Sequence, residues 1–265
     1  SDSHVFDEET PARQFWAGWL VPTIFHFQEA HTTQVLDAAV RTVNRFHTES
    51  ERRPLDFAVL TGDLINNRQR NELDWLVQTL EGGRVNPDSG ADDDPLPGLD
   101  PHDPFDAEGL AVPWFATLGN HDRLFEGHLA SDVLVGSPTR DRARFAVQAG
   151  CVKTDLPVHC GVARPTEAFS VLPRQIPPDP RRAPVEVEDV IEALRGHGFT
   201  DSGASYWRAD PAPGVRLVGL DTSTDEGLFG RLDEAQLAFL DRELAAADSA
   251  GDIAIITSHH PSGDL

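Results

Sequence analysis

Four short polar clusters in the sequence contain side chains of the types that bind metal ions. They are Asp2-Ser3-His4, Gly62-Asp63, Gly119-Asn120-His121-Asp122 and Ser258-His259-His260-Pro261. Carboxylate, imidazole and amide oxygen together suit a divalent ion of intermediate hardness such as Mn, Fe, Zn or Co, whereas an all-oxygen set would favour Mg or Ca. The clusters therefore predict a divalent-metal site, provided that the fold brings them together.

Each cluster taken alone also has a structural interpretation. A Gly-Asp pair after a strand is commonly a turn, and the Asn-His-Asp cluster could cap a helix. All four clusters, however, stand where a strand is expected to end, and segments with helical periodicity separate them. Their joint occurrence favours one metal site over four independent turns.

Short β-branched runs alternate with amphipathic stretches, which is typical of a layered α/β fold. Apolar residues at three- to four-residue spacing predict helices over 33–46, 68–80 and 231–246. Within the last helix, the inward-facing residues are expected to be Leu232, Leu237, Leu240 and Leu244. Apolar runs predict buried strands over 56–61, 112–118 and 253–257, and a hairpin formed by 205–208 and 215–220. We expect these elements to position the polar clusters.

The ends of the strands explain how distant clusters could meet. In open α/β sheets, ligands bind beyond the carboxyl ends of the strands. The glycines before Asp63 and Asn120 allow the backbone to turn sharply as it leaves the sheet. Side chains two residues apart on a strand point to the same face, so Asp2 and His4 are expected to bind one ion.

The overall charge limits the classes of partner. Among 265 residues, 44 are acidic and 22 are Lys or Arg, which gives a formal charge of −22. Nucleic-acid-binding arms and polybasic membrane patches both need clustered cations, so this balance excludes them and favours a small substrate. No apolar run approaches the roughly 18 residues needed to span a bilayer. The sequence leaves the oligomeric state and the compartment, cytoplasmic or exported, open.

Two segments interrupt the alternation. Residues 86–108 contain eight acidic residues and five prolines but no Lys or Arg, which predicts a solvated and partly mobile loop insertion. The alternative, a calcium loop, lacks the alternating carboxylates and central glycine of an EF-hand. Residues 128–200 are rich in Pro and Arg and are expected to form a cap beside the site. Cys151 and Cys160 are compatible with either a disulfide or two free thiols.

With these motifs the sequence resembles the calcineurin-like metallophosphoesterases. The matching motifs are SDSH at 1–4, TGDLINN at 61–67, LGNHD at 118–122 and TSHHP at 257–261, with GLDTS at 219–223 similar to the strand before the family's last helix. SDSHVFDEETPAR is most similar to the actinobacterial branch. The resemblance implies one domain over 1–265, a sandwich of two mixed β-sheets flanked by helices, with the insertions forming a cap.

The sequence departs from the family at both ends. The strand that should precede Asp2 is missing, and the final GHxH motif does not occur after Pro261. We interpret the sequence as a piece of a longer protein, in which two further histidine ligands are expected beyond residue 265.

The resemblance implies a two-metal centre in this chain. Asp2 and His4 would bind the first ion, and Asn120 and His259 the second. Asp63 would bridge both ions. A hydroxide shared by the ions would then attack a phosphomonoester or a phosphodiester, so no side-chain nucleophile is required.

The catalytic residues implied by the resemblance are His121 and Asp122. His121 would approach the substrate phosphate, and Asp122 would fix its tautomer, unless Asp122 only caps the following turn. His260 should project away from the ligand position. The alternative function is a phosphoesterase-fold scaffold that binds metal or a partner without turnover, but such scaffolds typically lose the histidine after Asn. A metal-dependent hydrolase of non-phosphate bonds would use similar ligands without the GNHD context.

Overall fold

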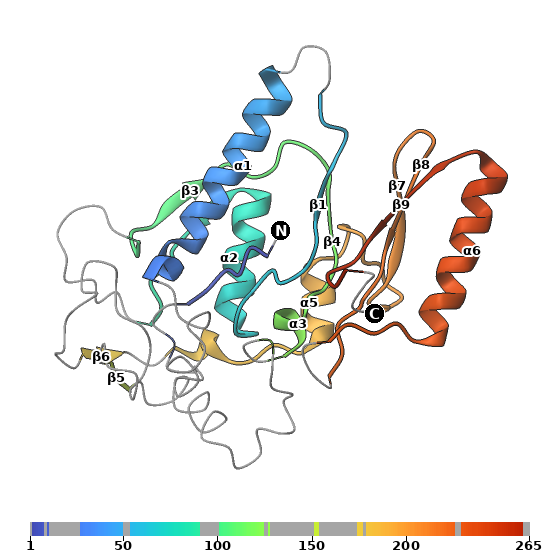
Figure 1. The fold of residues 1–265 in the computed structure, drawn as a ribbon. Helices are drawn as coiled ribbons and strands as arrows, with labels where there is room; N and C mark the ends of the chain where they lie inside the picture. Colours follow the sequence, from blue (N-terminus) through green and yellow to red (C-terminus); the bar gives the residue numbers. More distant parts are fainter. Residues whose placement is uncertain are drawn as a thin grey trace.

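The computed structural model describes residues 2–7, 10, 27–49, 54–90, 101–124, 127, 151–153, 174–176, 179–225 and 229–261. These residues form a mixed α/β fold (Figure 1). The first half contains η3 Phe27–His31, α1 Thr32–Glu49, β1 Ala58–Leu60, α2 Arg70–Glu81, β2 Gly83–Val85, β3 Phe105–Ala107, β4 Trp114–Ala116 and α3 Asn120–Arg123. The second half contains β5 Cys151–Lys153, β6 Arg174–Ile176, η5 Pro180–Arg182, α5 Val187–Ala193, β7 Trp207–Ala212, β8 Val215–Gly219, α6 Glu234–Ala250 and β9 Ile253–Thr257.

The strands form four small sheets. β1 and β4 pair in parallel, β2 pairs antiparallel with β3, and β5 pairs antiparallel with β6. The three-stranded sheet is mixed, because β8 lies antiparallel to β7 and parallel to β9. The predicted α/β class and the predicted hairpin are confirmed. No helix among the described residues is both long and apolar enough to cross a membrane.

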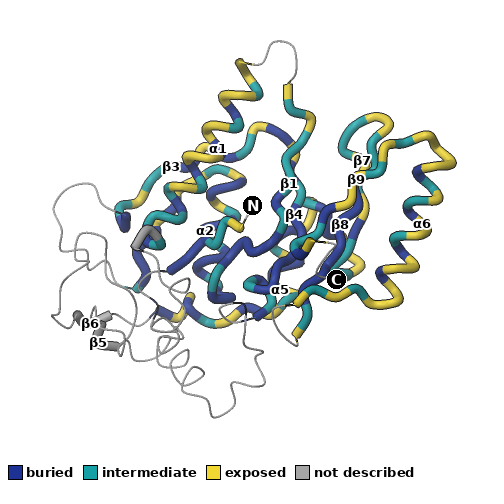
Figure 2. The backbone as a smooth tube through the Cα atoms, in the orientation of Figure 1, coloured by how far each residue is buried: buried dark blue, intermediate teal, exposed yellow. Residues whose placement is uncertain are grey.

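The main core lies between α2, the β1–β4 pair and α5. Leu73, Leu76 and Leu80 of α2 are at most 1% exposed, as the helical spacing predicted. Figure 2 shows the buried residues concentrated between α2 and the three-stranded sheet, with exposed residues along α1 and α6. Val190 of α5 belongs to the same core cluster. Apolar residues within 179–200 are therefore part of the core, whereas a cap was expected over 128–200.

The acidic segment 86–108 is also partly built into the fold. Asp88 is 5% exposed, Ser89 is fully buried, and Phe105–Ala107 forms β3. The Ser89 hydroxyl donates to Asp7 and is itself contacted by the Arg182 guanidinium, which explains its burial. The prediction of a solvated loop is therefore wrong for these parts, and 91–100 lie outside the described residues. Cys160 lies outside them as well.

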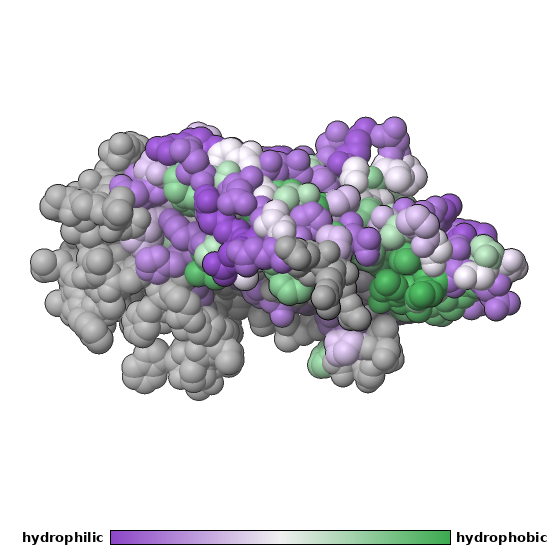
Figure 3. Space-filling model, turned by 90° about the horizontal axis from the view of Figure 1, so that it is seen from above, coloured by the Kyte–Doolittle hydropathy of each residue, from purple (hydrophilic) through white to green (hydrophobic). Residues whose placement is uncertain are grey.

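The three-stranded sheet differs from expectation in what covers it. Ile253, Ile255 and Ile256 of β9 are 67%, 39% and 48% exposed, so the prediction of a buried strand is wrong. Figure 3 shows an apolar area at the end of the molecule that carries this sheet. β9 pairs only with β8 among the described strands, which makes it an edge strand. On α6, Leu237 is exposed and Phe239 is buried instead.

Candidate metal centre

Three strand ends deliver polar residues to the same place. Asp63 follows β1, Asn120 follows β4, and His259 follows β9. Because β1 and β4 are parallel neighbours, their carboxyl ends share one edge. The His259 imidazole reaches that edge from the other sheet, and its Nδ1 lies 3.0 Å from the Thr61 carbonyl oxygen.

Two glycines allow these loops to approach closely. A Cβ on Gly62 would lie 2.7 Å from the Gly119 nitrogen and 2.9 Å from the His259 Cβ. A Cβ on Gly119 would lie 2.2 Å from both the Asp63 nitrogen and its Oδ1. Gly62 also has a φ of +94°, which side chains disfavour. Gly62 is thus required by contact and by its backbone conformation, whereas Gly119, with an ordinary φ of −111°, is required by contact alone.

Asp63 is the centre of the cluster. It is 5% exposed, and its Oδ2 lies 3.4 Å from His259 Nε2, 3.6 Å from His4 Nε2 and 4.0 Å from His121 Nε2. His4 and His121 also meet edge to face, with ring centroids 4.5 Å apart. Two overlapping groups have potential ligand atoms within 4.8 Å of one another, His4-Asp63-His121 and Asp2-Asp63-His259. Both groups share Asp63.

The two remaining candidate ligands lie at the rim of the cluster, next to His259. Asn120 Oδ1 is 3.0 Å from His259 Nε2. Asp2 Oδ1 is 3.7 Å from His259 Nδ1, and the Asp2 side chain is 63% exposed. The structure therefore brings all five predicted ligand residues to one region, with Asp2 on the solvent side.

Each imidazole is held at Nδ1 by an oxygen on the side away from Asp63. His4 Nδ1 lies 3.1 Å from Asn66 Oδ1, and His121 Nδ1 lies 3.0 Å from the Asn66 carbonyl oxygen. His259 uses the Thr61 carbonyl in the same way. In the neutral tautomer that donates from Nδ1 to these oxygens, Nε2 carries the lone pair, which is the usual arrangement behind a metal-binding histidine. Sequence reasoning missed Asn66, whose only signal was an amide three residues after Asp63.

The surroundings of His259 test whether a cation fits. A neutral imidazole carries one N–H, and Nδ1 is the nitrogen beside the Thr61 carbonyl. The Nε2 lone pair then faces Asn120 Oδ1 at 3.0 Å and Asp63 Oδ2 at 3.4 Å. In this neutral tautomer, three electron-rich atoms converge with no hydrogen between them. A divalent cation would satisfy all three, so the residues fit a metal.

The backbone is strained at several of these residues. Among the described residues, those other than glycine with positive φ are Asp2, His4, Asp63 and Arg68, at 33°, 40°, 48° and 54°. Such conformations cost about 1–3 kcal/mol each and cluster at functional sites. Left-handed φ at Asp2 and His4 interrupts the strand alternation from which their common face was expected, but both residues lie next to Asp63.

Asp122 has a different partner from the one predicted. Its Oδ1 accepts from the backbone N–H groups of Leu64 and Ile65, at 2.8 and 3.0 Å, and its Oδ2 accepts from Gly119 at 2.8 Å. Fixing the His121 tautomer is thus the role of the Asn66 carbonyl, and the prediction for Asp122 is wrong. The alternative role, capping, fits Asp122, because its carboxylate accepts from the N–H of Gly119, which is the N-cap of α3.

The Asp122 carboxyl also has an altered acidity. Burial raises its pKa to about 8, and the negative charge of Asp63 adds to this effect, while the three backbone N–H groups oppose it. Asp122 ties the loop after β1 to the start of α3 through these bonds. Its contribution is to hold the two ligand loops together.

The second sheet supports the cluster from behind. The Arg123 guanidinium pairs with Asp221 at 2.5 Å, in the segment that follows β8. Thr222 Oγ1 lies 3.0 Å from His260 Nδ1 and accepts from the His260 backbone N–H at 3.1 Å. His260 therefore projects towards Thr222, as expected for the neighbour of a ligand. The GLDTS motif thus contacts both α3 and the loop after β9.

Comparison with known proteins adds no relative. No family model matches the chain, and no curated protein is similar to it. Any assignment of function consequently depends on the motifs and on the geometry around Asp63.

Proposed function

We propose that the protein is a binuclear, metal-dependent phosphoesterase of the calcineurin-like metallophosphoesterase type. The observation that carries the proposal is the convergence of three imidazoles, each anchored at Nδ1, whose Nε2 atoms lie 3.4–4.0 Å from Asp63 Oδ2. The mixed three-stranded sheet and the parallel β1–β4 pair support a fold with two layered sheets. The proposal includes the two-sheet sandwich of that family.

The proposed ligands divide around Asp63. Asp2 and His4 would hold one ion, Asn120 and His259 the other, and Asp63 both. When bound, two ions of Mn, Fe, Zn or Co would supply Lewis acidity and lower the pKa of a water molecule. The anchoring of Nδ1 by Thr61 and Asn66 keeps the imidazoles in the tautomer that this chemistry needs.

His121 has a different proposed role, towards the substrate. Its side chain is 16% exposed, and its Nδ1 is fixed by the Asn66 carbonyl. With Nδ1–H kept on the Asn66 carbonyl, Nε2 would stabilise the phosphoryl charge or give a proton to the leaving oxygen in the imidazolium form, in which both ring nitrogens carry a proton. A net charge of −22 repels polyanions, so we propose a small phosphoester as substrate.

Turnover of two generic substrates tests the proposal. We expect hydrolysis of an aryl phosphate or an aryl phosphodiester with Mn²⁺ added, and its loss with a chelator. Calorimetric titration with Mn²⁺ measures binding separately. Mn²⁺ binding without turnover would favour the scaffold alternative, and absence of binding would remove the metal centre altogether.

Replacing the proposed proton donor separates binding from chemistry. His121→Ala should lower kcat by about 10²–10⁴-fold, the usual effect of removing a general acid, and keep Mn²⁺ binding within a few-fold. His197, which stacks on Trp114 at a centroid distance of 3.5 Å, provides the matched control. His197→Ala should leave kcat and Mn²⁺ binding unchanged. Loss of Mn²⁺ binding in His121→Ala as large as its loss of kcat would contradict the assigned role.

A further inference from the structure

We propose that Gly127 is a positioning residue of this centre, an inference that rests on the proposed function. Gly127 is buried and follows the short helix α3. Its carbonyl oxygen sets the orientation of the Asn120 amide, and the absence of a side chain leaves space for the His121 imidazole. No motif in the sequence marks Gly127.

The first contact concerns the Asn120 amide. Asn120 Nδ2 donates to the Gly127 carbonyl oxygen at 3.1 Å. The oxygen and nitrogen of an amide have nearly the same shape, so hydrogen bonding decides which end faces a neighbour. With its nitrogen held by Gly127, Asn120 presents Oδ1 to His259 Nε2 at 3.0 Å. An amide oxygen binds a cation and an amide NH₂ does not, so the Gly127 carbonyl selects the productive orientation.

The second contact concerns the imidazole. A Cβ on Gly127 would lie 2.4 Å from Asn120 Nδ2, 2.4 Å from His121 Cδ2 and 2.5 Å from His121 Nε2. These distances are far below van der Waals contact, so any side chain would displace the ring or the amide. The opposite side of the ring is held by the Asn66 carbonyl. Gly127 and Asn66 therefore confine His121 between them.

The placement of Gly127 is itself fixed by α3. The Gly127 N–H donates to the Leu124 carbonyl at 3.1 Å, and the Leu124 N–H donates to the Asn120 carbonyl at 2.7 Å. These bonds join Gly127 to the end of the helix that carries Asn120 and His121, next to the side chains of both residues.

Gly203 provides a matched control for substitution. Gly127 and Gly203 both have a φ of +69°, so alanine at either position meets the same backbone strain. A Cβ on Gly203 would have no atom within 4 Å. Differences between Gly127→Ala and Gly203→Ala therefore report the contacts with Asn120 and His121.

The experiment measures three quantities in the wild type and both variants. Mn²⁺ affinity is measured by calorimetry, kcat and KM with an aryl phosphate at saturating Mn²⁺, and stability by urea unfolding without metal. For Gly127→Ala we expect Mn²⁺ affinity to fall by about 10–100-fold, as when an outer-shell partner is removed. We also expect a lower kcat with little change in KM. Gly203→Ala should match the wild type in both respects, and Gly127→Ala should lose more stability than Gly203→Ala, because its Cβ meets Asn120 and His121 in addition to the shared backbone strain.

The outcomes separate this inference from the proposed function. Equal Mn²⁺ affinity and kcat in Gly127→Ala and Gly203→Ala would overturn the inference alone. A wild-type protein that binds no Mn²⁺ would overturn the proposed function and this inference with it.

Asn120→Asp gives a second test that does not depend on the folding of Gly127→Ala. By charge alone, the added carboxylate would strengthen Mn²⁺ binding. However, an aspartate cannot donate to the Gly127 carbonyl and is repelled by it. We therefore expect Asn120→Asp to bind Mn²⁺ more weakly than the wild type. Equal or tighter binding would overturn the inference.

Discussion

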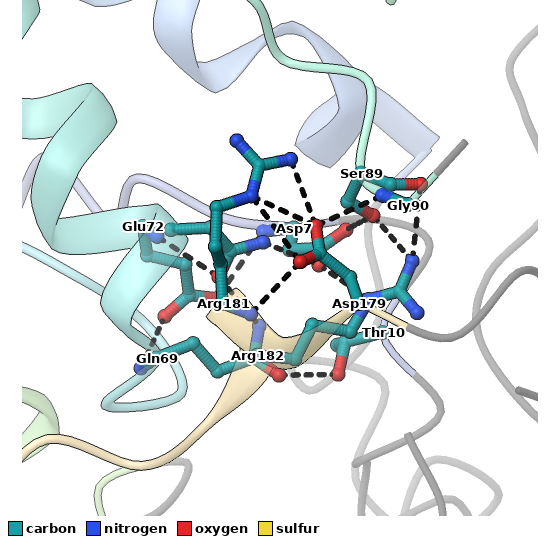
Figure 4. A network of polar contacts seen from close by, with 10 residues as sticks. Asp7, Thr10, Gln69, Glu72, Ser89, Gly90, Asp179, Arg181 and Arg182 are labelled. Carbon is teal, nitrogen blue, oxygen red and sulfur yellow. Dashed lines mark hydrogen bonds and ion pairs between the residues drawn. The ribbon is translucent and has the colours of Figure 1, made fainter. Parts of the chain in front are cut away.

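Two buried carboxylates, Asp7 and Asp63, differ in how their charges are neutralised. Asp7 is fully buried, and its Oδ2 accepts from Asn71 Nδ2 at 2.7 Å and from Arg182 Nε at 3.0 Å. Its Oδ1 accepts from the Ser89 hydroxyl at 2.9 Å (Figure 4). Every one of these partners is a donor in any protonation state that occurs near neutral pH.

Asp63 has a partner set of another kind. Its Oδ1 accepts from the His121 backbone N–H at 2.9 Å, but its Oδ2 faces three imidazole nitrogens. In the tautomer that the Thr61 and Asn66 oxygens favour, each of these nitrogens carries a lone pair instead of a hydrogen. The carboxylate of Asp7 is therefore satisfied by the protein itself, whereas that of Asp63 has the surroundings expected of the metal ligand that we propose. The contrast gives a way to test that proposal against a structural network in the same molecule.

The largest expected effect is the loss of folding stability when the ion pair at Asp7 is removed. Arg182→Met leaves a buried carboxylate without its cation, and such losses cost about 3–5 kcal/mol of stability. Urea unfolding of the metal-free protein measures this effect. Arg84→Met is the matched control, because the Arg84 and Asp106 side chains of that ion pair are 59% and 82% exposed. An exposed pair contributes about 0.2–1 kcal/mol, so equal destabilisation by both variants would contradict a structural role for Arg182.

The second prediction removes the negative charge of Asp63. Asp63→Asn should lower Mn²⁺ affinity by about 100-fold or more, at or beyond the upper end of what losing an outer-shell partner costs. Stability without metal should stay equal or increase, because the negative charge of Asp63 disfavours the charged form of Asp122. Calorimetry with Mn²⁺ and urea unfolding measure the two effects.

Asp7→Asn gives the opposite combination. It should destabilise the protein, because Arg182 loses its carboxylate partner, and leave Mn²⁺ affinity unchanged in the folded fraction. The comparison between the two carboxylates fails if Asp63→Asn destabilises the metal-free protein as much as Asp7→Asn does.

The sequence predicts the two regions to very different degrees. Asp63, Asn120 and His259 each follow a strand, so local pattern and strand-end geometry were enough to nominate them. Arg182 lies in a Pro- and Arg-rich segment expected to form a cap, and its partner Asp7 is 175 positions away. A pair with such separation has no periodicity that could reveal it.

The same limit explains what was missed inside the site. Asn66 contacts His121, and Gly127 contacts Asn120, through backbone carbonyls, which every residue type has, so these two contacts leave little trace in the sequence. Asp122 was assigned to the wrong partner, because adjacency to His121 suggested a side-chain contact that the helical turn of α3 does not make. Motifs thus indicated which residues meet, but not which atoms orient them.

The third prediction concerns Asn66. Asn66→Ala removes the Oδ1 that holds His4 Nδ1 but keeps the carbonyl that holds His121. We expect Mn²⁺ affinity to fall by about 10-fold, at the low end for outer-shell partners, with kcat per bound metal nearly unchanged. Asn67→Ala is the control, because the side-chain amide of Asn67 has no hydrogen-bond partner among the described residues. Equal loss of Mn²⁺ affinity in both variants would show that the loop, and not the Asn66 amide, is responsible.

The last prediction is a pH dependence of stability from Glu72. Burial raises the pKa of this carboxyl to about 8 from a usual 4.5, although backbone N–H groups of Asn67, Asp7 and Gln69 oppose the shift. Between these values the folded protein keeps a proton that the unfolded chain has lost. Stability should therefore fall as pH rises from 4.5 to about 8, by at most about 1.4 kcal/mol per pH unit.

Glu72→Gln isolates this contribution, because glutamine does not titrate. Urea unfolding from pH 5 to 9 should give a flatter dependence for Glu72→Gln than for the wild type, with the difference largest below about pH 8. Glu49→Gln makes the same change at an exposed position at the end of α1 and should keep the wild-type slope. Parallel curves for Glu72→Gln and the wild type would mean that Glu72 is charged in the folded protein. The three N–H groups would then outweigh the burial, and the network around Asp7 would contain two negative charges.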